Sequence, residues 1–264
     1  MKKTDLLVIG GSAGGILAAT MARKAYGDLD ITVIRETKTV MVPCGIPYIF
    51  GTLRSLEKNR IPDAGLLNAN INIIVDTAME INREHKTVAT RENGVFGYKK
   101  LIIATGSLPI VPTFIPGYDL ENVFPVTKEE TYLGKIFEKL ETSQNITVIG
   151  GGFIGVEFAE QIRVLGKNVT LIEMAESCLW QAFDKSYTDD LEFLLKDSGI
   201  EVMTGTKVKE ILGEKSVESV ALGDGRTIPT DMVILGLGVK PNGALAKDCG
   251  LEVNAKGAGK VDQY

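Results

Sequence analysis

The sequence predicts an α/β protein made of two three-layer (ββα) units, with the second unit inserted into the first. Two observations carry this prediction. A buried strand, a glycine-rich loop, a helix and a second buried strand follow one another twice, in residues 6–34 and in residues 146–172. Further strand-like segments follow each copy. Because a βαβ unit with a glycine loop after its first strand is Rossmann-like, two copies indicate two bound dinucleotides.

Composition fits a soluble protein with ample core. The chain has 264 residues, of which 44% are hydrophobic, and a formal net charge of -5. No basic cluster is present, so no nucleic-acid partner is expected. No apolar run is as long as a membrane-spanning helix, and the glycines near the N-terminus argue against a secretory signal. We therefore expect a cytoplasmic protein with no membrane partner.

Cysteine and histidine usage limits the chemistry. Cys44, Cys178 and Cys249 are widely spaced, and His85 is the only histidine. No Cys/His cluster exists, so we expect no metal site and no disulfide framework. His85 lies in a polar run between two strand-like segments and is interpreted as an exposed turn residue. For Cys178 and Cys249 a structural role is expected, and Trp180 and Phe183 are expected to be packing residues rather than substrate contacts.

The first copy departs from the dinucleotide-binding pattern GxGxxG. Gly10 and Gly15 hold its outer positions, but Ser12 holds the middle one. After the second strand, Ile31–Ile34, an acid is expected to bind the adenosine ribose. Here Arg35 comes first and Glu36 follows.

We expect Glu36 to contact the ribose. The open alternative is a shift of one residue, which would leave Arg35 near the adenosine.

Cys44 is the candidate redox centre. It stands in Val-Pro-Cys-Gly-Ile-Pro-Tyr, soon after the first βαβ copy. A helix that begins near Pro47 would direct backbone N–H groups towards the sulfur and favour the thiolate. A thiolate can attack a disulfide or cycle through a sulfenic acid. The alternative is a small buried cysteine with no chemistry, and spacing alone does not decide between the two.

Several short segments complete the predicted sheets. The expected strands are Ile71–Val75, Ala78–Ile81, Thr87–Ala89, Leu101–Ala104, Glu201–Met203, Val208–Leu212, Val217–Leu222 and Met232–Leu235. A helix is expected from Asp184 to Lys196. The proline-rich stretch Pro109–Pro116 and the segment Gly238–Asn242 are interpreted as crossings between domains. The first domain is therefore expected over residues 1–111 and 241–264, and the second over residues 112–240.

The second copy fits the dinucleotide pattern at every position. Gly150, Gly152 and Gly155 form GxGxxG after one strand and before a helix. These glycines allow a tight turn, a close approach of backbone N–H groups to a pyrophosphate, and close packing of helix and strand. Glu173 ends the next strand, where a carboxylate accepts hydrogen bonds from ribose hydroxyls and repels a 2′-phosphate. This favours NADH over NADPH.

The motifs, taken in order, resemble the pyridine nucleotide-disulfide oxidoreductase family. They are the Gly10–Gly15 loop, Cys-Gly-Ile-Pro-Tyr, Leu-Ile-Ile-Ala-Thr-Gly-Ser, Val-Ile-Gly-Gly-Gly-Phe-Ile-Gly-Val-Glu and Gly-Val-Lys-Pro-Asn. The nearest group is the single-cysteine branch, which contains coenzyme A-disulfide reductases, NADH oxidases, NADH peroxidases and persulfide reductases. Position 49 is Ile, so the CxxxxC pair of the dithiol branch is absent.

The resemblance implies a role for each motif. The FAD pyrophosphate would be held by Gly10, Gly11, Ser12, Gly14 and Gly15, and the flavin would be passed by Ala104, Thr105 and Gly106. NADH would be bound by Gly150, Gly152, Phe153, Ile154, Gly155, Glu173 and Gly238. Phe153 resembles the aromatic gate over the flavin, and Glu157 a catalytic glutamate near flavin and nicotinamide. In relatives that use coenzyme A, basic residues contact it where Arg23 and Lys24 stand here; an exposed basic helix end is the alternative.

The implied reaction passes a hydride from NADH through FAD to oxidised Cys44, and then to a small disulfide, persulfide or polysulfide. Alternatives are reduction of oxygen or peroxide, electron transfer to rubredoxin or ferredoxin, and a dinucleotide-binding fragment without catalysis. Family members are dimers and continue beyond the position of Tyr264 into a second FAD motif and a dimerisation domain. We expect both to be missing from this sequence. Val40 and Met41 also replace the usual Ser-Phe or Ser-His pair before the cysteine.

Overall fold

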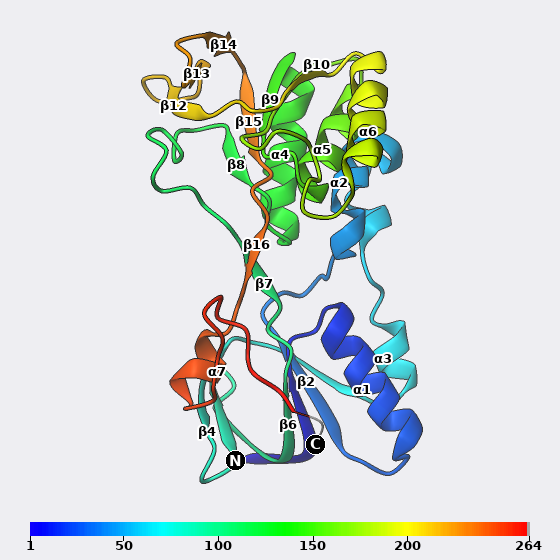
Figure 1. Cartoon of the computed structure of the whole chain (residues 1–264). Coiled ribbons are helices and arrows are strands. Elements are labelled where there is room, and N and C mark those ends of the chain that lie inside the picture. The colour runs from blue at the N-terminus through cyan, green and yellow to red at the C-terminus, as the bar shows by residue number, and fades with distance from the viewer. Residues whose placement is uncertain (263–264) are drawn as a thin grey trace. The chain divides into compact units, whose positions relative to one another are not determined.

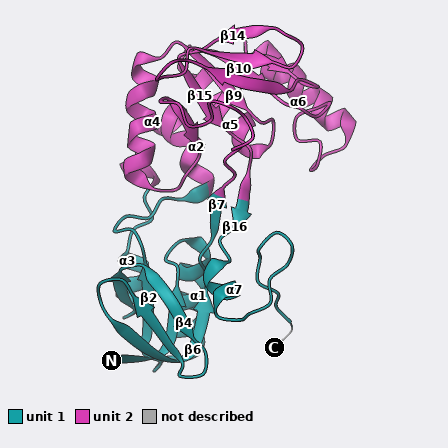
Figure 2. Ribbon diagram, turned by 90° about the vertical axis from the view of Figure 1, so that its left-hand side faces the viewer, with its two compact units in different colours: residues 1–43, 60–108, 240–264 teal, residues 44–59, 109–239 magenta. Residues whose placement is uncertain are grey.

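The computed structural model describes residues 1–262 (Figure 1). The chain forms two compact units. Unit 1 comprises residues 1–43, 60–108 and 240–264, and unit 2 comprises residues 44–59 and 109–239 (Figure 2). The long piece of unit 2 lies between two pieces of unit 1 in the sequence, which confirms the predicted insertion. Gln263 and Tyr264, at the end of the first expected domain, lie outside the described residues.

Unit 1 is built on a six-stranded sheet in the order β3-β2-β1-β6-β5-β4. The first four strands are parallel, and β5 and β4 continue antiparallel from the start of β6. Its elements are β1 (Lys2–Ile9), α1 (Ala13–Ala25), β2 (Ile31–Arg35), α3 (Ala64–Asn68), β3 (Asn72–Val75), β4 (Ala78–Asn82), β5 (Thr87–Thr90), β6 (Val95–Ile103) and α7 (Ala244–Asp248).

Alternation along β1 creates the two cores of unit 1. Leu6 and Val8 face one way and pack with Ala19 of α1 and with Leu66 of α3. Leu7 and Ile9 face the other way and pack with β4, β5 and β6, through Ile81, Val88 and Phe96. Because successive strand residues point to opposite faces, one apolar strand serves both a helical and a strand layer. The unit is thus three-layered, as predicted.

Unit 2 repeats this plan with a five-stranded parallel sheet in the order β11-β10-β9-β15-β8 and a three-stranded antiparallel sheet in the order β12-β13-β14. Its elements are α2 (Ile46–Tyr48), β8 (Val123–Pro125), α4 (Glu130–Thr142), β9 (Asn145–Ile149), α5 (Phe153–Arg163), β10 (Asn168–Ile172), α6 (Lys185–Asp197), β11 (Glu201–Met203), β12 (Val208–Leu212), β13 (Ser219–Leu222), β14 (Thr227–Pro229) and β15 (Met232–Leu235). A core that includes Ile149, Ile172, Val220 and Val233 joins the two sheets. The predicted α/β class with two Rossmann-like units is confirmed.

Three details differ from the expectations. Helix α4 was not predicted, although Leu133, Ile136 and Leu140 form its buried stripe. Its N-cap is Glu129, whose carboxylate accepts from two backbone N–H groups of the first turn, and glutamate is not among the usual capping residues. Strand β6 begins at Val95, six residues before the expected Leu101, because its first part pairs with β5.

The third difference concerns the segment that carries Cys44. Residues 44–59 group with unit 2, whereas the expected domain boundary placed them with the first unit. The chain passes between the units at residues 108–109 and 239–240, next to or within the two expected crossings, Pro109–Pro116 and Gly238–Asn242. Around these points β7 (Ser107–Pro109) and β16 (Val239–Pro241) pair as a two-stranded sheet. Which nucleotide each unit binds stays a prediction.

Candidate functional site

The two glycine loops are hydrogen-bonded in the same way. Gly10 N donates to Ile34 O, and Gly150 N donates to Ile172 O, each over 2.8 Å. Both glycines have a positive φ, +113° and +107°, which a residue with a side chain rarely adopts. The loops therefore turn sharply at the carboxyl ends of β1 and β9, where ligands bind in open α/β sheets.

The third glycine of each loop is required by packing. A Cβ atom at Gly15 would overlap the carbonyl oxygen of Gly10, and a Cβ atom at Gly155 would overlap that of Gly150. By contrast, Cβ atoms at Gly14 and Gly152 would point into open space. Helix and strand are thus in close contact, while the loop backbone keeps an open side that a pyrophosphate can approach.

The helices that follow the loops are suited to an anion. Helix α1 begins after Ser12 and α5 after Gly152, and neither first turn contains an acidic residue. The Ser12 side chain makes no capping hydrogen bond, so its hydroxyl is not committed to the helix. Unneutralised helix N-termini and their backbone N–H groups favour phosphate. The residues present therefore fit two dinucleotides.

The segments after β6 and β15 close each loop from the other side. Ala104 N donates to Ile9 O over 2.7 Å, and Gly236 N donates to Ile149 O over 2.8 Å. Ala104, Thr105 and Gly106 in unit 1 thus correspond in position to residues 236–238 in unit 2, which include the predicted Gly238. The Thr105 hydroxyl donates to the carbonyl oxygen of Asn242 over 2.5 Å, which joins two of the motifs found in the sequence.

In unit 2 the acid position is filled as predicted by Glu173. Its carboxylate accepts hydrogen bonds from Gly151 N over 2.5 Å and from Ala175 N over 2.7 Å. Its Cβ lies 2.9 Å from where a Cβ of Gly151 would be. Two backbone donors thus fix this carboxylate beside the glycine loop.

In unit 1 the corresponding position holds Arg35. Ile34 and Ile172 occupy equal register positions, so the next residues, Arg35 and Glu173, are equivalent. The Arg35 Cβ lies 2.8 Å from where a Cβ of Gly11 would be. The Glu36 side chain follows the strand and is exposed. The contact predicted between Glu36 and the ribose stays a prediction. In the structure, Arg35 rather than Glu36 occupies the position equivalent to Glu173.

Cys44 is exposed, at the start of a short helical segment. The turn Pro43–Gly45 leads into α2 and then into a π-helical turn, Ile49–Leu53. The exposure is inconsistent with the alternative of a buried structural cysteine. The expected helix near Pro47 is therefore present but is irregular and short.

The Cys44 segment is fixed to helix α5. Phe50 is fully buried and its ring lies 5.2 Å from that of Phe158. The buried Gln161 side-chain oxygen accepts from Thr52 N over 2.9 Å and from Thr52 Oγ1 over 2.8 Å. Gln161 also leaves no room for a Cβ at Gly51. These contacts, which the sequence did not reveal, tie the cysteine segment to the helix that begins at the second glycine loop.

Helix α5 also carries Phe153, Ile154 and Glu157. Burial and the neighbouring Glu160 raise the pKa of Glu157 above its usual range. Phe153 is 56% exposed and meets Phe183 edge-on, with ring centroids 6.0 Å apart. A mobile aromatic gate would need such exposure. Trp180 and Phe183 were expected to be packing residues, but their side chains are 55% and 48% exposed, so neither is a core residue.

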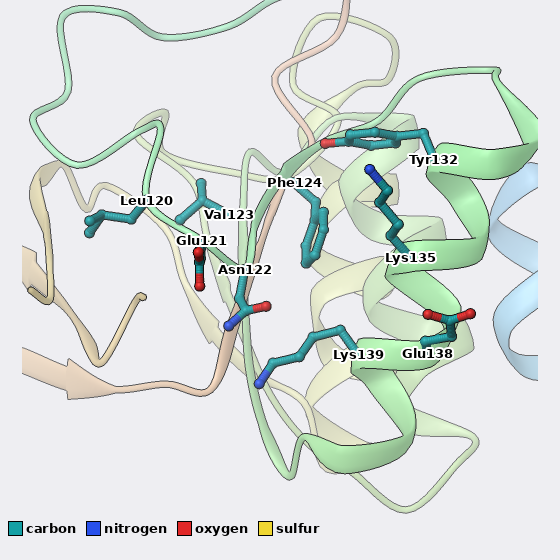
Figure 3. Close-up of a pocket in the computed structure, with 9 residues that line it drawn as sticks. All are labelled: Leu120, Glu121, Asn122, Val123, Phe124, Tyr132, Lys135, Glu138 and Lys139. Atoms are coloured by element: carbon teal, nitrogen blue, oxygen red, sulfur yellow. The ribbon is translucent and has the colours of Figure 1, made fainter. Parts of the chain in front are cut away.

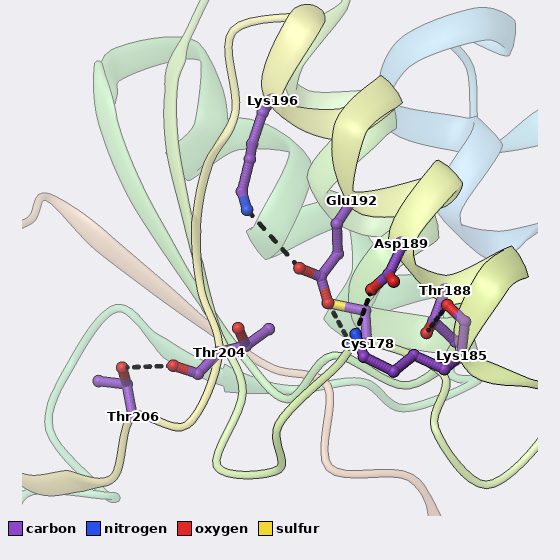
Figure 4. A network of polar contacts seen from close by, with 8 residues as sticks. All are labelled: Cys178, Lys185, Thr188, Asp189, Glu192, Lys196, Thr204 and Thr206. Atoms are coloured by element: carbon purple, nitrogen blue, oxygen red, sulfur yellow. Dashed lines mark hydrogen bonds and ion pairs between the residues drawn. The ribbon is translucent and has the colours of Figure 1, made fainter.

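Cys178 lies beneath the second glycine loop, within the polar network of Figure 4. The thiol is fully buried, and its sulfur lies 2.8 Å from where a Cβ of Gly151 would be. Cys178 N donates to Glu192, which is also ion-paired with Lys196. Burial and the carboxylates of Glu192 and Glu173 raise the pKa of the thiol to about 12. Cys178 is therefore a packing residue, as expected.

The basic residues at the end of α1 differ from each other. Arg23 donates to the carbonyl oxygens of Ala69, Gly27 and Asn70 over 2.5–3.0 Å, whereas Lys24 is exposed. Arg23 thus joins α1 to the turn after α3. Coenzyme A binding by these two residues stays a prediction. His85 is exposed in a turn, as expected.

A hollow of about 540 Å³ lies on unit 2 between β8 and α4 (Figure 3). Its lining comprises Leu120, Glu121, Asn122, Val123, Phe124, Tyr132, Lys135, Glu138 and Lys139. Burial raises the pKa of Tyr132 to about 12. None of the residues predicted from sequence lies here, so the hollow is separate from the glycine loops.

Among residues 1–262, no group of three or more His, Cys, Asp or Glu side chains is placed to hold a metal ion. In the same part of the chain, every helix is too short or too polar to cross a membrane.

Comparison with known proteins shows the family. The model of the pyridine nucleotide-disulphide oxidoreductase family matches residues 4–264, and the chain therefore belongs to this family. A "NAD(P)H coenzyme A polysulfide/persulfide reductase" of Pyrococcus horikoshii is 33% identical, over 97% of this chain and 58% of the relative. The chain thus spans little more than half the length of this relative.

Solved structures agree in fold. The "NAD-Dependent Persulfide Reductase from A. fulgidus" is 33% identical with a TM-score of 0.89, over 96% of this chain and 49% of that one. The "Water-forming NADH oxidase from Lactobacillus brevis", bound to NADH, is 26% identical with a TM-score of 0.86, over 98% of this chain and 58% of that one.

Proposed function

We propose that this protein is an FAD- and NADH-dependent oxidoreductase that reduces a sulfur substrate through Cys44. Unit 1 would bind FAD and unit 2 would bind NADH. The substrate class is a coenzyme A disulfide, a persulfide or a polysulfide. The single observation that carries the proposal is the exposed Cys44 on a segment anchored to α5, the helix that begins at the Glu173-bearing glycine loop and contains Glu157. The names of the P. horikoshii and A. fulgidus relatives support the sulfur chemistry.

The residues that would hold the two cofactors are those of the two loops. FAD would lie against Gly10–Gly15 and Ala104–Gly106. NADH would lie against Gly150–Gly155 and Gly238, with Glu173 on its ribose. Bound FAD would supply the two-electron step between the nicotinamide and sulfur, taking a hydride from NADH and delivering the electron pair to oxidised Cys44.

Cys44 would perform the sulfur exchange. Its thiolate attacks one sulfur of a disulfide, forms a mixed disulfide and releases the other half as a thiolate. Two electrons from NADH then break the mixed disulfide, which releases the second thiol and restores the Cys44 thiolate. Exposure of the sulfur is required for the attack. Burial and Glu160 raise the pKa of Glu157, which favours its protonated form and suits it to exchange a proton during this cycle. The three cysteines are free, which suits a reducing cytoplasm.

The test compares wild-type protein with Cys44→Ser. We expect a yellow protein whose flavin absorbance is bleached by NADH in both forms. Reduction of coenzyme A disulfide or polysulfide should fall by at least about a thousandfold in the variant, because the nucleophile is lost. Cys249→Ser is the matched control and should retain full activity. Unchanged disulfide and polysulfide reduction by Cys44→Ser would show that the cysteine mechanism is wrong.

Reduction of oxygen is a second candidate, favoured by the similarity to the L. brevis NADH oxidase. Product analysis separates the two candidates. Under air, with no sulfur substrate, an oxidase consumes oxygen in proportion to NADH, whereas a sulfur reductase consumes NADH rapidly only after disulfide or polysulfide is added.

A further inference from the structure

Arg35 has an unusual set of contacts for a residue beside a nucleotide loop. Its side chain is 4% exposed and lies across Gly11, with Cδ 2.7 Å from where a Cβ of Gly11 would be. Its two terminal nitrogens donate to the two carboxylate oxygens of Asp63, over 2.5 and 2.7 Å, and one also donates to Lys38 O over 2.7 Å. The guanidinium is thus held in one orientation by a bidentate pair.

One donor of this group is left over. Arg35 Nε is buried and has no hydrogen-bond partner within residues 1–262. A buried N–H without a partner is destabilising, and native structures usually satisfy it. Nε is bonded to Cδ, the atom that lies over Gly11, so the unsatisfied donor is beside the first glycine loop. A ligand oxygen at this loop would supply the missing acceptor.

Asp63 supplies the complementary group. It stands at the N-cap of α3, yet its side chain makes no capping hydrogen bond because both oxygens face Arg35. The carboxylate remains 37% exposed, so it has room to accept a further hydrogen bond. The hydrogen bond from Arg35 lowers its pKa, and it stays ionised at neutral pH. The pair therefore offers one free donor and a partly free acceptor at the position where unit 2 offers only the carboxylate of Glu173.

We infer that Arg35 and Asp63 form the adenosine-ribose site of unit 1, in place of the acid that follows the strand in unit 2. Arg35 Nε donates to a ribose hydroxyl oxygen, and Asp63 accepts from a ribose hydroxyl. A ribose hydroxyl can serve both roles, so the pair satisfies it as fully as a carboxylate does. The exposed Glu36 is not needed. This inference rests on the proposed binding of FAD to unit 1.

The experiment measures binding to the flavin-free protein through quenching of flavin fluorescence, with FAD and with FMN, which lacks the adenosine. Arg35→Lys keeps the positive charge beside Asp63 but removes Nε. We expect it to weaken FAD binding about tenfold, the usual effect of losing a hydrogen bond to a charged group. FMN binding should stay within about twofold. Glu36→Gln is the matched control on the neighbouring residue, and its FAD affinity should stay within about twofold of wild type.

Three results would overturn the inference. Arg35→Lys that binds FAD as wild type does would exclude a contact through Nε. Equal losses for FAD and FMN would show that the pair only supports the fold. Weaker FAD binding by Glu36→Gln, with unchanged FAD binding by Arg35→Lys, would show that Glu36 contacts the ribose.

A second measurement needs no variant, in case Arg35→Lys fails to fold. FAD analogues that lack the 2′- or the 3′-hydroxyl of the adenosine ribose are titrated into wild-type protein. At least one should bind about tenfold more weakly than FAD. Equal binding by both would exclude a ribose contact in unit 1 altogether. Wild-type protein that binds no FAD would instead refute the proposed function, and the inference with it.

Discussion

Arg35 in unit 1 and Glu173 in unit 2 follow equivalent strands and lie against equivalent glycines, yet they carry opposite charges. The backbone around them is hydrogen-bonded in the same way, from the turn at Gly10 or Gly150 to the strand beyond it. Both loops are expected to hold a pyrophosphate, and the residue after the second strand is expected to meet the adenosine ribose. FAD and NADH have both of these groups in common, so the two units diverge at a part of the ligand that is the same in each.

What lies beneath the loops differs too. In unit 1 the stem of Arg35 covers Gly11, and Asp63 holds the guanidinium. In unit 2 the thiol of Cys178 lies beside Gly151, together with Glu173. A different titratable group thus lies near each glycine loop: the Asp63 carboxylate in unit 1 and the Cys178 thiol in unit 2.

The largest effect is expected where the units are identical. Gly15→Ala and Gly155→Ala each place a Cβ on the carbonyl oxygen of the first loop glycine, so helix and strand must separate. We expect each to lower the free energy of unfolding by about 3 kcal/mol or more. Urea titration measures this. Trp180 is the single tryptophan and lies in unit 2, so its fluorescence reports Gly155→Ala selectively.

Gly14→Ala and Gly152→Ala are the matched controls, because their Cβ atoms meet open space. They should unfold within about 1 kcal/mol of wild type. Equal stability of Gly15→Ala and Gly14→Ala would show that the close approach in unit 1 is not as tight as described.

The next effect concerns the charge difference itself. Glu173→Gln keeps an oxygen that can accept from Gly151 N but removes the charge that repels a 2′-phosphate. We expect the preference for NADH over NADPH to fall at least about tenfold, which corresponds to about 1.4 kcal/mol. Titration with each reduced coenzyme measures it. Glu176→Gln, an exposed residue of the same loop, should leave the preference unchanged. A Glu173→Gln protein that still rejects NADPH as wild type does would place the discrimination elsewhere.

Features encoded by residues close together in the chain could be predicted from the sequence. The βαβ copies were predictable because strand, glycine loop and helix lie within about thirty residues, and Glu173 falls in register with its loop. Arg35 remained an open alternative because its partner, Asp63, lies 28 residues later in the chain. The pairing becomes visible only when α3 is packed beside β2. No periodic pattern encodes such a contact.

The placement of residues 44–59 was hidden for a related reason. The segment is continuous in sequence with unit 1, but Phe50 and Thr52 pack on α5, more than a hundred residues away. The interaction depends on Gln161, a polar residue at a buried helix position, where sequence patterns predict an apolar one. Packing on α5, and not position in the chain, therefore decides that residues 44–59 belong to unit 2.

A moderate effect is expected at this contact. Gln161→Ala leaves Thr52 N and Oγ1 without their acceptor and should destabilise unit 2 by about 1–3 kcal/mol. Loosening of the segment should also raise the rate at which a thiol reagent labels Cys44. Labelling of Cys249, in unit 1, should not change. Thr52→Ser keeps both donors and serves as the control. If Cys44 in Gln161→Ala reacted at the wild-type rate, the segment would be held by its aromatic contacts alone.

The last two effects separate the units by pH. Arg35 lowers the pKa of Asp63, so the folded protein gains stability from this carboxylate above the ordinary aspartate pKa and loses it as pH falls through the lowered value. In unit 2 the sign is reversed. The pKa of Cys178 is raised to about 12, so between the ordinary thiol value near 9 and 12 the folded state holds the extra proton and stability falls as pH rises.

These opposite slopes can be assigned by substitution. Asp63→Asn should flatten the loss of stability below about pH 4 and leave the alkaline side unchanged. Cys178→Ala should remove the fall in stability between about pH 9 and pH 12, read from Trp180 fluorescence during urea unfolding. Because Asp63 lies in unit 1 and Cys178 in unit 2, each variant should change stability on only one side of the pH range, the acid side for Asp63→Asn and the alkaline side for Cys178→Ala. A variant that changed the free energy of unfolding at both acid and alkaline pH would show that the two units unfold in one cooperative step. The difference between Arg35 and Glu173 could then not be assigned to separately unfolding units.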